Sequence, residues 1–354
     1  MKQVLRVFDD PAPAAIPADF VDFLLWLGGP ALLHISGIDN TRKRALSVLV
    51  HGNETSGARA LHRWLCLGRR PRVSLLCFVS GVEAALCEPL LSQRFVPGER
   101  DLNRCFRPPF NDRPGHIAQA MLAVLQAERP DCLVDMHNTS APSPAFAIAP
   151  HEDVAHEALG ALFCNNLVIT EITLGALMES SGDPCPAITV ECGATGDPRA
   201  EQVAWEGLQR YLHDEAVPGV PAPDSHLELF HRPVRLELEP GTRLAWGDGP
   251  VAGADLTVRQ DLERFNFTTV DPDLAIGWLG PRGLDPLRVN DRMGRNRCDE
   301  WFRIQDGRLH TKESVRLFMV TSSLKMAMDD CLLYASRERE HTSLKSMLTS
   351  QIQS

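Results

Sequence analysis

The amino-acid sequence predicts an α/β protein in which a mostly parallel mixed sheet is flanked by helices, with a smaller C-terminal β-rich domain. Two observations support this prediction. Up to about residue 214, short apolar runs alternate with segments of helical periodicity, a pattern typical of parallel sheets with helices on both faces. After that point, short strand-like pieces are separated by Gly and Pro. The 354 residues can form a large core and a second unit, since one domain takes roughly 100 to 200 residues.

The elements of the larger domain, expected over residues 31–216, follow one another in α/β order. Residues 1–30 are expected to form an N-terminal leader with a short amphipathic helix over Pro17 to Leu27. Pro130 ends a predicted helix, because proline cannot continue one. Strands are predicted at 32–36, 45–50, 73–79, 132–136, 167–170 and 187–191, and helices at 55–68, 113–128, 154–164 and 199–214.

A linker rich in proline, marked by Pro218, Pro221 and Pro223, leads into the β-rich domain expected over residues 225–340. Helical spacing is expected from Ser322 to about Arg339. The predicted strands of this domain are 234–238, 243–246, 275–279, 302–304 and 315–320.

Two predicted strands end in residues that bind metal ions. His51 and Glu54 follow the run 45–50, and His137 follows the run 132–136. A catalytic zinc site takes three such ligands and leaves its fourth position to water. Asp135 lies two residues before His137 and would accept the proton on the other ring nitrogen of a ligand histidine. A plain strand-end aspartate explains Asp135 equally well.

Four motifs in order resemble the succinylglutamate desuccinylase and aspartoacylase family, which is related to the zinc carboxypeptidases. They are the segments His51 to Glu54, Asp101 to Arg104, Asp135 to Ser140 and Ile188 to Gly193. The resemblance covers about residues 45 to 195. It implies a zinc carboxypeptidase-like fold and a zinc-hydrolase catalytic domain within residues 31–216.

The resemblance also implies roles for single residues. His51, Glu54 and His137 would hold one Zn²⁺, which lowers the pKa of bound water to about 7. Glu191 would take the proton of that water and pass it to the leaving amine.

Other residues would bind the substrate or stabilise the reaction intermediate. The resemblance implies that Asn103 and Arg104 bind it, with Arg104 offering a planar fork to a carboxylate. Arg94 is the arginine that we expect to stabilise the oxyanion of the tetrahedral intermediate. Arg100 is an alternative, and a surface position for both arginines stays open. The resemblance also makes Tyr334 a candidate for reaching the substrate, because related enzymes use a tyrosine from this half of the chain.

One departure from the family pattern leaves the substrate open. Aspartoacylase-like members carry an arginine about ten residues before the catalytic glutamate, and this chain has none there. Glu179 and Asp183 lie in that stretch instead, and they would repel an anion if they faced the site. N-acetylaspartate is therefore not supported as the substrate.

We interpret the chain as a zinc-dependent hydrolase that cleaves an amide bond, other than a peptide bond, in a small N-acyl amino acid-like substrate. Two alternatives stay open: a zinc carboxypeptidase-type peptidase, and a metal-binding or ligand-binding protein that has lost catalysis. The substrate is expected to carry a carboxylate, and a homo-oligomer stays open.

Composition limits the partners. The net charge of −10 argues against nucleic acid, because binding to phosphates relies on clustered Lys and Arg. None of the ten cysteines forms a Cys-x-x-Cys pair. The first ten residues lack the apolar core of a signal peptide, and the broken run 20–33 is too short to span a bilayer. We therefore expect a cytoplasmic protein with no membrane partner.

Overall fold

The computed structural model describes residues 4–180, 185–214, 217–219, 227–291 and 293–337. The chain divides into two compact units, one up to Arg232 and one from Pro233 on. Among the described residues, no helix has the length and apolar character needed to cross a membrane.

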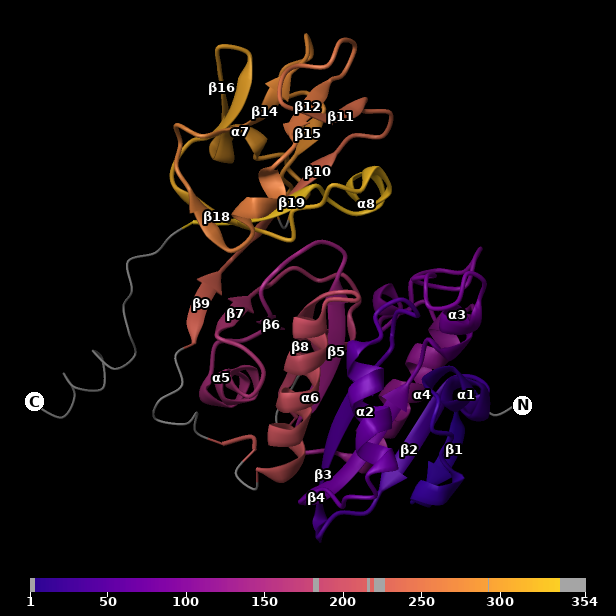
Figure 1. The fold of residues 1–354 in the computed structure, drawn as a ribbon. Helices are drawn as coiled ribbons and strands as arrows, with labels where there is room; N and C mark the ends of the chain where they lie inside the picture. Colours follow the sequence, from indigo (N-terminus) through magenta and orange to yellow (C-terminus); the bar gives the residue numbers. More distant parts are fainter. Residues whose placement is uncertain (1–3, 181–184, 215–216, 220–226, 292, 338–354) are drawn as a thin grey trace, which may run out of the picture. The chain divides into compact units, whose positions relative to one another are not determined.

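The first unit is built on a nine-stranded sheet with the order β1-β2-β4-β3-β5-β8-β6-β7-β9 (Figure 1). Only the β2/β4 and β6/β8 pairs are antiparallel, so the predicted mostly parallel mixed sheet is confirmed. Its strands are β1 (Arg6–Asp9), β2 (Ala31–Ile35), β3 (Asp39–Val48), β4 (Val73–Val79), β5 (Leu133–Thr139), β6 (Phe146–Ala149), β7 (Asn166–Ile169), β8 (Ala187–Ala194) and β9 (Glu228–His231).

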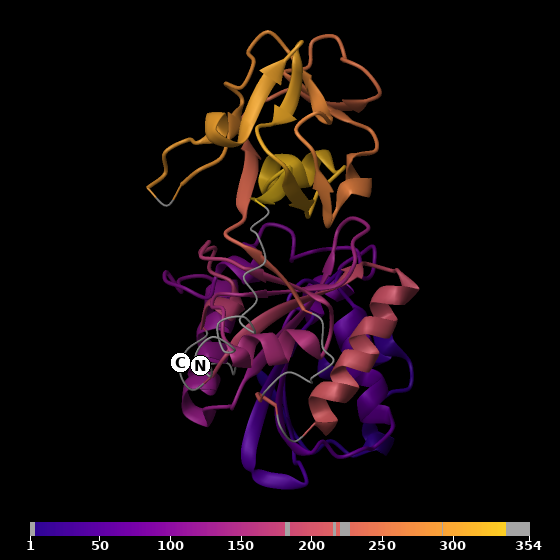
Figure 2. The ribbon, with the colours of Figure 1, turned by 90° about the vertical axis from the view of Figure 1, so that its left-hand side faces the viewer.

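Helices cover both faces of this sheet (Figures 1 and 2). They are α1 (Phe20–Leu27), α2 (Ser56–Cys66), α3 (Val82–Leu86), α4 (Arg113–Glu128), α5 (Val154–Ala161) and α6 (Pro198–His213), with short 3₁₀ turns η1 (Pro13–Ala15), η2 (Leu102–Arg104) and η3 (Leu177–Ser180). One core joins Leu46, Val134 and Ile188 to residues of α2 and α6. A second core joins Ala45, Leu133 and Ala187 to residues of α4. Since strand side chains alternate between faces, these two sets mark the two sides of the sheet.

Local sequence explains the ends of α4. The side chain of Asp112 accepts a hydrogen bond from the backbone N–H of Gly115 at 2.9 Å, which is the usual N-cap arrangement. Arg129 takes a left-handed conformation at the other end, and Pro130 follows it. The predicted helix 113–128 is therefore found with the same limits.

Several differences from the expected elements concern the sheet. β9 falls in the range expected for the β-rich domain but pairs in parallel with β7. β5 runs to Thr139, so His137 lies inside a strand and not after it. β6 was not expected, because four residues are too few to give a periodic signal. β1 pairs in parallel with β2, and the segment expected as a leader therefore contributes a strand and the helix α1 to the first unit.

The second unit contains two five-stranded sheets, with the orders β13-β18-β19-β10-β15 and β11-β12-β14-β17-β16. Its elements are β10 (Val234–Leu238), β11 (Leu244–Gly247), β12 (Leu256–Arg259), η4 (Leu262–Phe265), β13 (Thr268–Val270), β14 (Ala275–Leu279), β15 (Leu287–Arg288), α7 (Cys298–Trp301), β16 (Phe302–Gln305), β17 (Arg308–Thr311), β18 (Val315–Phe318), α8 (Leu324–Asp329) and β19 (Leu333–Arg337). The expected β-rich character of this part is confirmed.

The expected long helix near the C-terminus is wrong over most of its described part. α8 ends at Asp329, and β19 follows as the middle strand of its sheet. β19 is buried on both faces, and such a strand lacks the alternation that separates it from a helix in sequence. Tyr334 lies in β19, where its ring stacks on Phe318 with centroids 5.6 Å apart. Its role toward a substrate stays a prediction.

Candidate metal centre

Three neighbouring parallel strands place the candidate ligands. β3, β5 and β8 lie side by side in the sheet, so their carboxyl ends meet at one edge, where α/β sheets bind ligands. His51 and Glu54 lie in the loop between β3 and α2, and His137 lies near the end of β5.

The loop from β3 to α2 has a tight path. A Cβ atom at Gly52 would lie 2.3 Å from the backbone nitrogen of Ala85. Only glycine therefore fits at position 52. Leu49 has a φ of 55°, a conformation that costs energy for a side chain of this size and that is found where the surroundings fix it. Packing therefore fixes the backbone conformation of the loop between β3 and α2.

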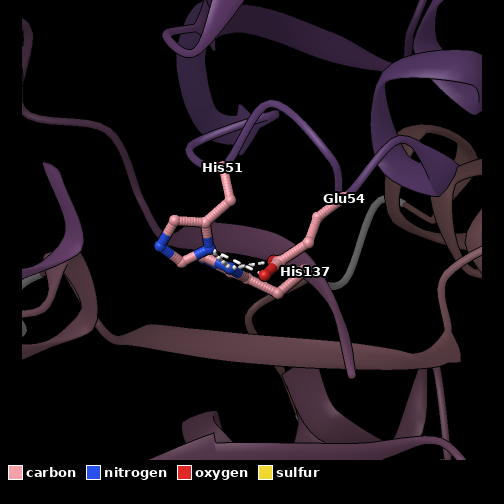
Figure 3. Close-up of side chains that lie close together, drawn as sticks. All are labelled: His51, Glu54 and His137. Atoms are coloured by element: carbon pink, nitrogen blue, oxygen red, sulfur yellow. Dashed lines mark hydrogen bonds and ion pairs between the residues drawn. The ribbon is translucent and has the colours of Figure 1, made fainter. Parts of the chain in front are cut away.

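The side chains of His51, Glu54 and His137 converge on one point (Figure 3). The Nδ1 atoms of the two histidines are 3.2 Å apart. Glu54 Oε1 lies 2.9 Å from His51 Nδ1, and Glu54 Oε2 lies 2.8 Å from His137 Nδ1. All three residues are buried. The cluster predicted from the sequence is therefore assembled by the fold.

Carboxylates on the far side of each ring determine which nitrogen carries the proton. His51 Nε2 lies 2.9 Å from Asp101 Oδ1, and His137 Nε2 lies 2.8 Å from Asp135 Oδ2. An ionised carboxylate only accepts hydrogen bonds, so each Nε2 carries hydrogen. In the neutral rings both Nδ1 lone pairs then face Glu54, which is the arrangement that second-sphere carboxylates give metal-binding histidines.

This donor set fits a zinc ion. Two imidazole nitrogens and one carboxylate are a common catalytic zinc set, and ligand atoms around a tetrahedral zinc stand roughly 3.3 Å apart. The two Nδ1 atoms are 3.2 Å apart, close to this value, and each lies within 2.9 Å of a different Glu54 oxygen. Without a metal, burial lowers the pKa of His137, but Asp135 and Glu54 outweigh this and raise it well above its ordinary value.

Glu191 lies beside these residues on β8. Its Cα pairs with that of His137, so the two side chains leave neighbouring strands on the same face of the sheet. Glu191 is 8% exposed, and its Oε2 has no hydrogen-bond partner among the described residues. Burial raises the pKa of its carboxyl to about 7. A carboxylate of this kind is suited to exchange protons near neutral pH.

Arg94 joins the cluster and Arg100 does not. Arg94 donates to Glu54 Oε1 at 2.9 Å and to Asp101 Oδ2 at 3.0 Å. Burial lowers the pKa of Arg94, but the two carboxylates outweigh it and raise the pKa, so the guanidinium stays charged. Arg100 instead donates two hydrogen bonds to Asp112 at the start of α4.

Asn103 and Arg104 form the turn η2 next to Asp101. The side-chain oxygen of Asn103 accepts from the backbone N–H of Leu177 at 3.1 Å. Arg104 Nη1 donates to the backbone carbonyl of Asn103 at 2.9 Å. Arg104 also contributes to lowering the pKa of Asp101, which places its positive charge near the cluster.

The acidic stretch that raised doubt about an anionic substrate is partly accounted for. The Glu179 carboxylate accepts hydrogen bonds from the backbone N–H groups of Leu174, Gly175 and Ala176. Its charge is therefore compensated by a turn of its own segment. Asp183 lies outside the described residues.

Sequence reasoning assigned no role to Asp101, although it stands in one of the four motifs. Asp101 contacts both His51 and Arg94 and also accepts from the backbone N–H of Asn103 at 2.8 Å. Burial raises its pKa, but His51, Arg94 and Arg104 outweigh this and hold it well below its ordinary value. The signal in the sequence was its position, two residues before Asn103.

Residues 40–206 match the model of the succinylglutamate desuccinylase/aspartoacylase catalytic domain. Over this range the chain is similar to the catalytic domain of that family. Members of the family are hydrolytic deacylases, and every candidate residue of the metal centre lies within the matched range. The resemblance inferred from the four motifs is thereby confirmed.

Solved structures of this deacylase family share the fold. The succinylglutamate desuccinylase of Vibrio parahaemolyticus is similar with a TM-score of 0.59 at 14% identity, over 92% of this chain and 98% of that chain. For the enzyme of Chromobacterium violaceum the TM-score is 0.54 at 14% identity, over 85% and 86%. Murine aminoacylase 3 gives 0.51 at 15% identity, over 84% and 96%. No curated protein sequence matches the chain.

Proposed function

We propose that this protein is a zinc-dependent hydrolase that cleaves the amide bond of a small N-acyl amino acid-like substrate. One observation carries the proposal: two histidine Nδ1 atoms and the Glu54 carboxylate converge beside Glu191, a buried carboxylate with an oxygen that has no partner among the described residues. His51, Glu54 and His137 would hold the zinc ion. When bound, zinc lowers the pKa of a water and polarises the scissile carbonyl.

Side chains of the protein would transfer the proton and stabilise the oxyanion. Glu191 takes one proton from the attacking water as the new C–O bond forms. It then gives that proton to the amide nitrogen as the C–N bond breaks, which leaves a carboxylic acid and a free amine. Arg94 places a positive charge beside Glu54 and would stabilise the oxyanion.

Arg104, together with Asn103, would bind a carboxylate of the substrate. A planar guanidinium recognises a carboxylate through two parallel hydrogen bonds.

The ten cysteines are all free thiols, which supports a reducing compartment such as the cytoplasm.

The test is a panel of N-acyl amino acids and short peptides, each assayed with zinc-loaded protein and with a chelator. We expect chelator-sensitive release of the amine from at least one N-acyl amino acid and a weaker rate with peptides. Cleavage of peptides alone would favour the peptidase interpretation. A zinc-loaded protein that hydrolyses no member of the panel would favour a protein without catalysis.

Two variants separate metal binding from catalysis. His137→Ala should lose the metal, as measured by elemental analysis of the purified protein. Glu191→Gln should keep the metal and lose about 10² to 10⁴-fold in kcat, the usual contribution of general acid–base catalysis. Near-normal turnover by Glu191→Gln would remove Glu191 as the base.

A further inference from the structure

Asn138 connects the segments that carry the metal ligands and Glu191. Its backbone N–H donates to Glu54 Oε2 at 3.2 Å. Its side-chain oxygen accepts from the backbone N–H of Ser56 at 3.1 Å. Its side-chain nitrogen donates to Ser56 Oγ at 2.9 Å and to the backbone carbonyl of Gly193 at 3.0 Å. At 4% exposure, this amide uses both of its N–H groups within the protein.

The contact with Ser56 fixes the start of α2. Thr55, the residue before the helix, makes no side-chain capping bond. The first N–H groups of a helix have no partner within it, and here Asn138 supplies the acceptor from strand β5. Because Glu54 lies two residues before Ser56, the same contact fixes the main chain that carries this metal ligand.

The contact with Gly193 bridges an irregularity in the sheet. β5 and β8 pair His137 with Glu191 and then Thr139 with Ala194, so β8 has one extra residue at this point. A β-bulge interrupts the ladder and redirects nearby side chains. The hydrogen bond from Asn138 to Gly193 ties the two strands together two residues after Glu191.

We infer that Asn138 is a positioning residue that holds the Glu191 carboxylate at a set place relative to Glu54 and His137. It would act through Glu191 and Glu54 without contacting the substrate. The inference rests on the proposed function, since it assigns to Asn138 the alignment of a base with a metal site.

Two substitutions separate the contacts of Asn138. Asn138→Ala removes all three side-chain hydrogen bonds. Asn138→Asp keeps an acceptor for the N–H of Ser56 but places an oxygen against the carbonyl of Gly193. The readouts are kcat and KM for the best substrate of the panel, the Kd for Co²⁺ by competition with a chromophoric chelator, the visible spectrum of the Co²⁺ complex and the melting temperature.

We expect both variants to lose roughly 10 to 100-fold in kcat, the range seen when residues behind metal ligands are changed. KM should stay nearly constant, because the Asn138 side chain is buried and its polar groups are bonded within the protein. Asn138→Ala should also bind Co²⁺ more weakly than Asn138→Asp and show an altered Co²⁺ spectrum, since it alone frees the start of α2. A purely structural role would lower the melting temperature and leave the Co²⁺ spectrum and the kcat of the folded fraction unchanged.

The matched control is Asn166→Ala. Asn166, in β7, also donates its side-chain N–H to a backbone carbonyl, that of Ala145 directly before β6 at 3.2 Å, but outside the metal centre. If Asn138→Ala does not fold, the same measurements are made on Asn138→Asp and Ser56→Ala. The loss of kcat is expected to be smaller in Ser56→Ala than in Asn138→Asp.

The outcomes distinguish two failures. Wild-type protein that neither binds Co²⁺ nor hydrolyses any substrate would overturn the proposed function itself. Active, Co²⁺-binding wild type with unchanged kcat and spectrum in the folded Asn138 variants would overturn only the role of Asn138. An equal loss of kcat in Asn166→Ala would overturn it as well.

Discussion

Asp101 joins a proposed metal ligand to the proposed oxyanion-binding arginine. Its two carboxylate oxygens accept from His51 Nε2 and Arg94 Nε. Asp101→Asn replaces one carboxylate oxygen by an amide N–H₂ group. This donor then faces the N–H of either His51 or Arg94. We expect this variant to bind zinc about 10 to 100-fold more weakly, as measured by competition with a chelator. The matched control is Asp112→Asn, since Asp112 also binds an arginine and caps a helix, and unchanged zinc affinity is expected there. Equal zinc affinity in wild type and Asp101→Asn would contradict the prediction.

Glu191 should make the stability of the metal-free protein depend on pH. Burial raises its pKa to about 7 from an ordinary 4.5, so between these values the folded state holds a proton that the unfolded state has released. Stability therefore falls as pH rises from about 4.5 to about 7. The penalty at the upper end is on the order of 3 kcal/mol.

Urea unfolding of metal-free wild type and Glu191→Gln across this range measures the effect. Glutamine does not titrate. The free energy of unfolding of the Glu191→Gln variant should therefore rise relative to that of wild type as pH increases. Titratable groups that do not interact with Glu191 are shared by the two proteins and cancel in the difference. Parallel curves for the two proteins would place the pKa of Glu191 near its ordinary value.

At the scale of elements, η2 is held by the segment that follows β7. Phe106 N–H donates to the carbonyl of Gly175 at 3.0 Å, and Leu177 N–H donates to the side chain of Asn103 at 3.1 Å. Glu179 in turn binds the N–H groups of residues 174 to 176. The proposed substrate-binding turn thus depends on a carboxylate that is remote from it in sequence.

Glu179→Ala should displace Asn103 and Arg104 without disturbing the metal ligands. We expect KM for a carboxylate-bearing substrate to rise about tenfold, equivalent to roughly 1.4 kcal/mol of lost binding, with the zinc content unchanged. Steady-state kinetics and elemental analysis give the two values. Glu206→Ala is the control, because Glu206 lies on the exposed side of α6 and contacts Gln202 and Arg210 there. A lower KM in Glu179→Ala would show instead that this carboxylate repels the substrate.

The elements that the sequence predicted best are those with local signals. Val73–Val79 and Arg113–Glu128 have the predicted limits, since an apolar run and a capped, proline-limited helix are each specified by neighbouring residues. The long C-terminal helix was wrong because β19 is buried on both faces. Among the site residues, the motifs named His51, Glu54 and His137, but the contacts of Asp101 and Asn138 depend on strand pairing and loop packing that no local pattern specifies.

At the scale of the whole molecule, the described residues show a separate hydrophobic core in each unit. Two buried clusters belong to residues before Pro233, and a third belongs to residues after it. His51, Glu54, His137 and the carboxylates behind them all lie in the first unit. Among the described residues, the candidate metal ligands therefore all come from the first unit.

This separation predicts the behaviour of a fragment comprising residues 1–232. It contains the complete nine-stranded sheet and both cores of the first unit, so it should fold and bind Co²⁺ with a Kd within about tenfold of the full chain, a difference of roughly 1.4 kcal/mol. The Co²⁺ spectrum should be the same in both, because the ligands and their carboxylate partners are unchanged. Circular dichroism establishes folding, and the fragment with His137→Ala is the control for adventitious binding. A folded fragment that binds no Co²⁺ would mean that the second unit takes part in forming the metal centre.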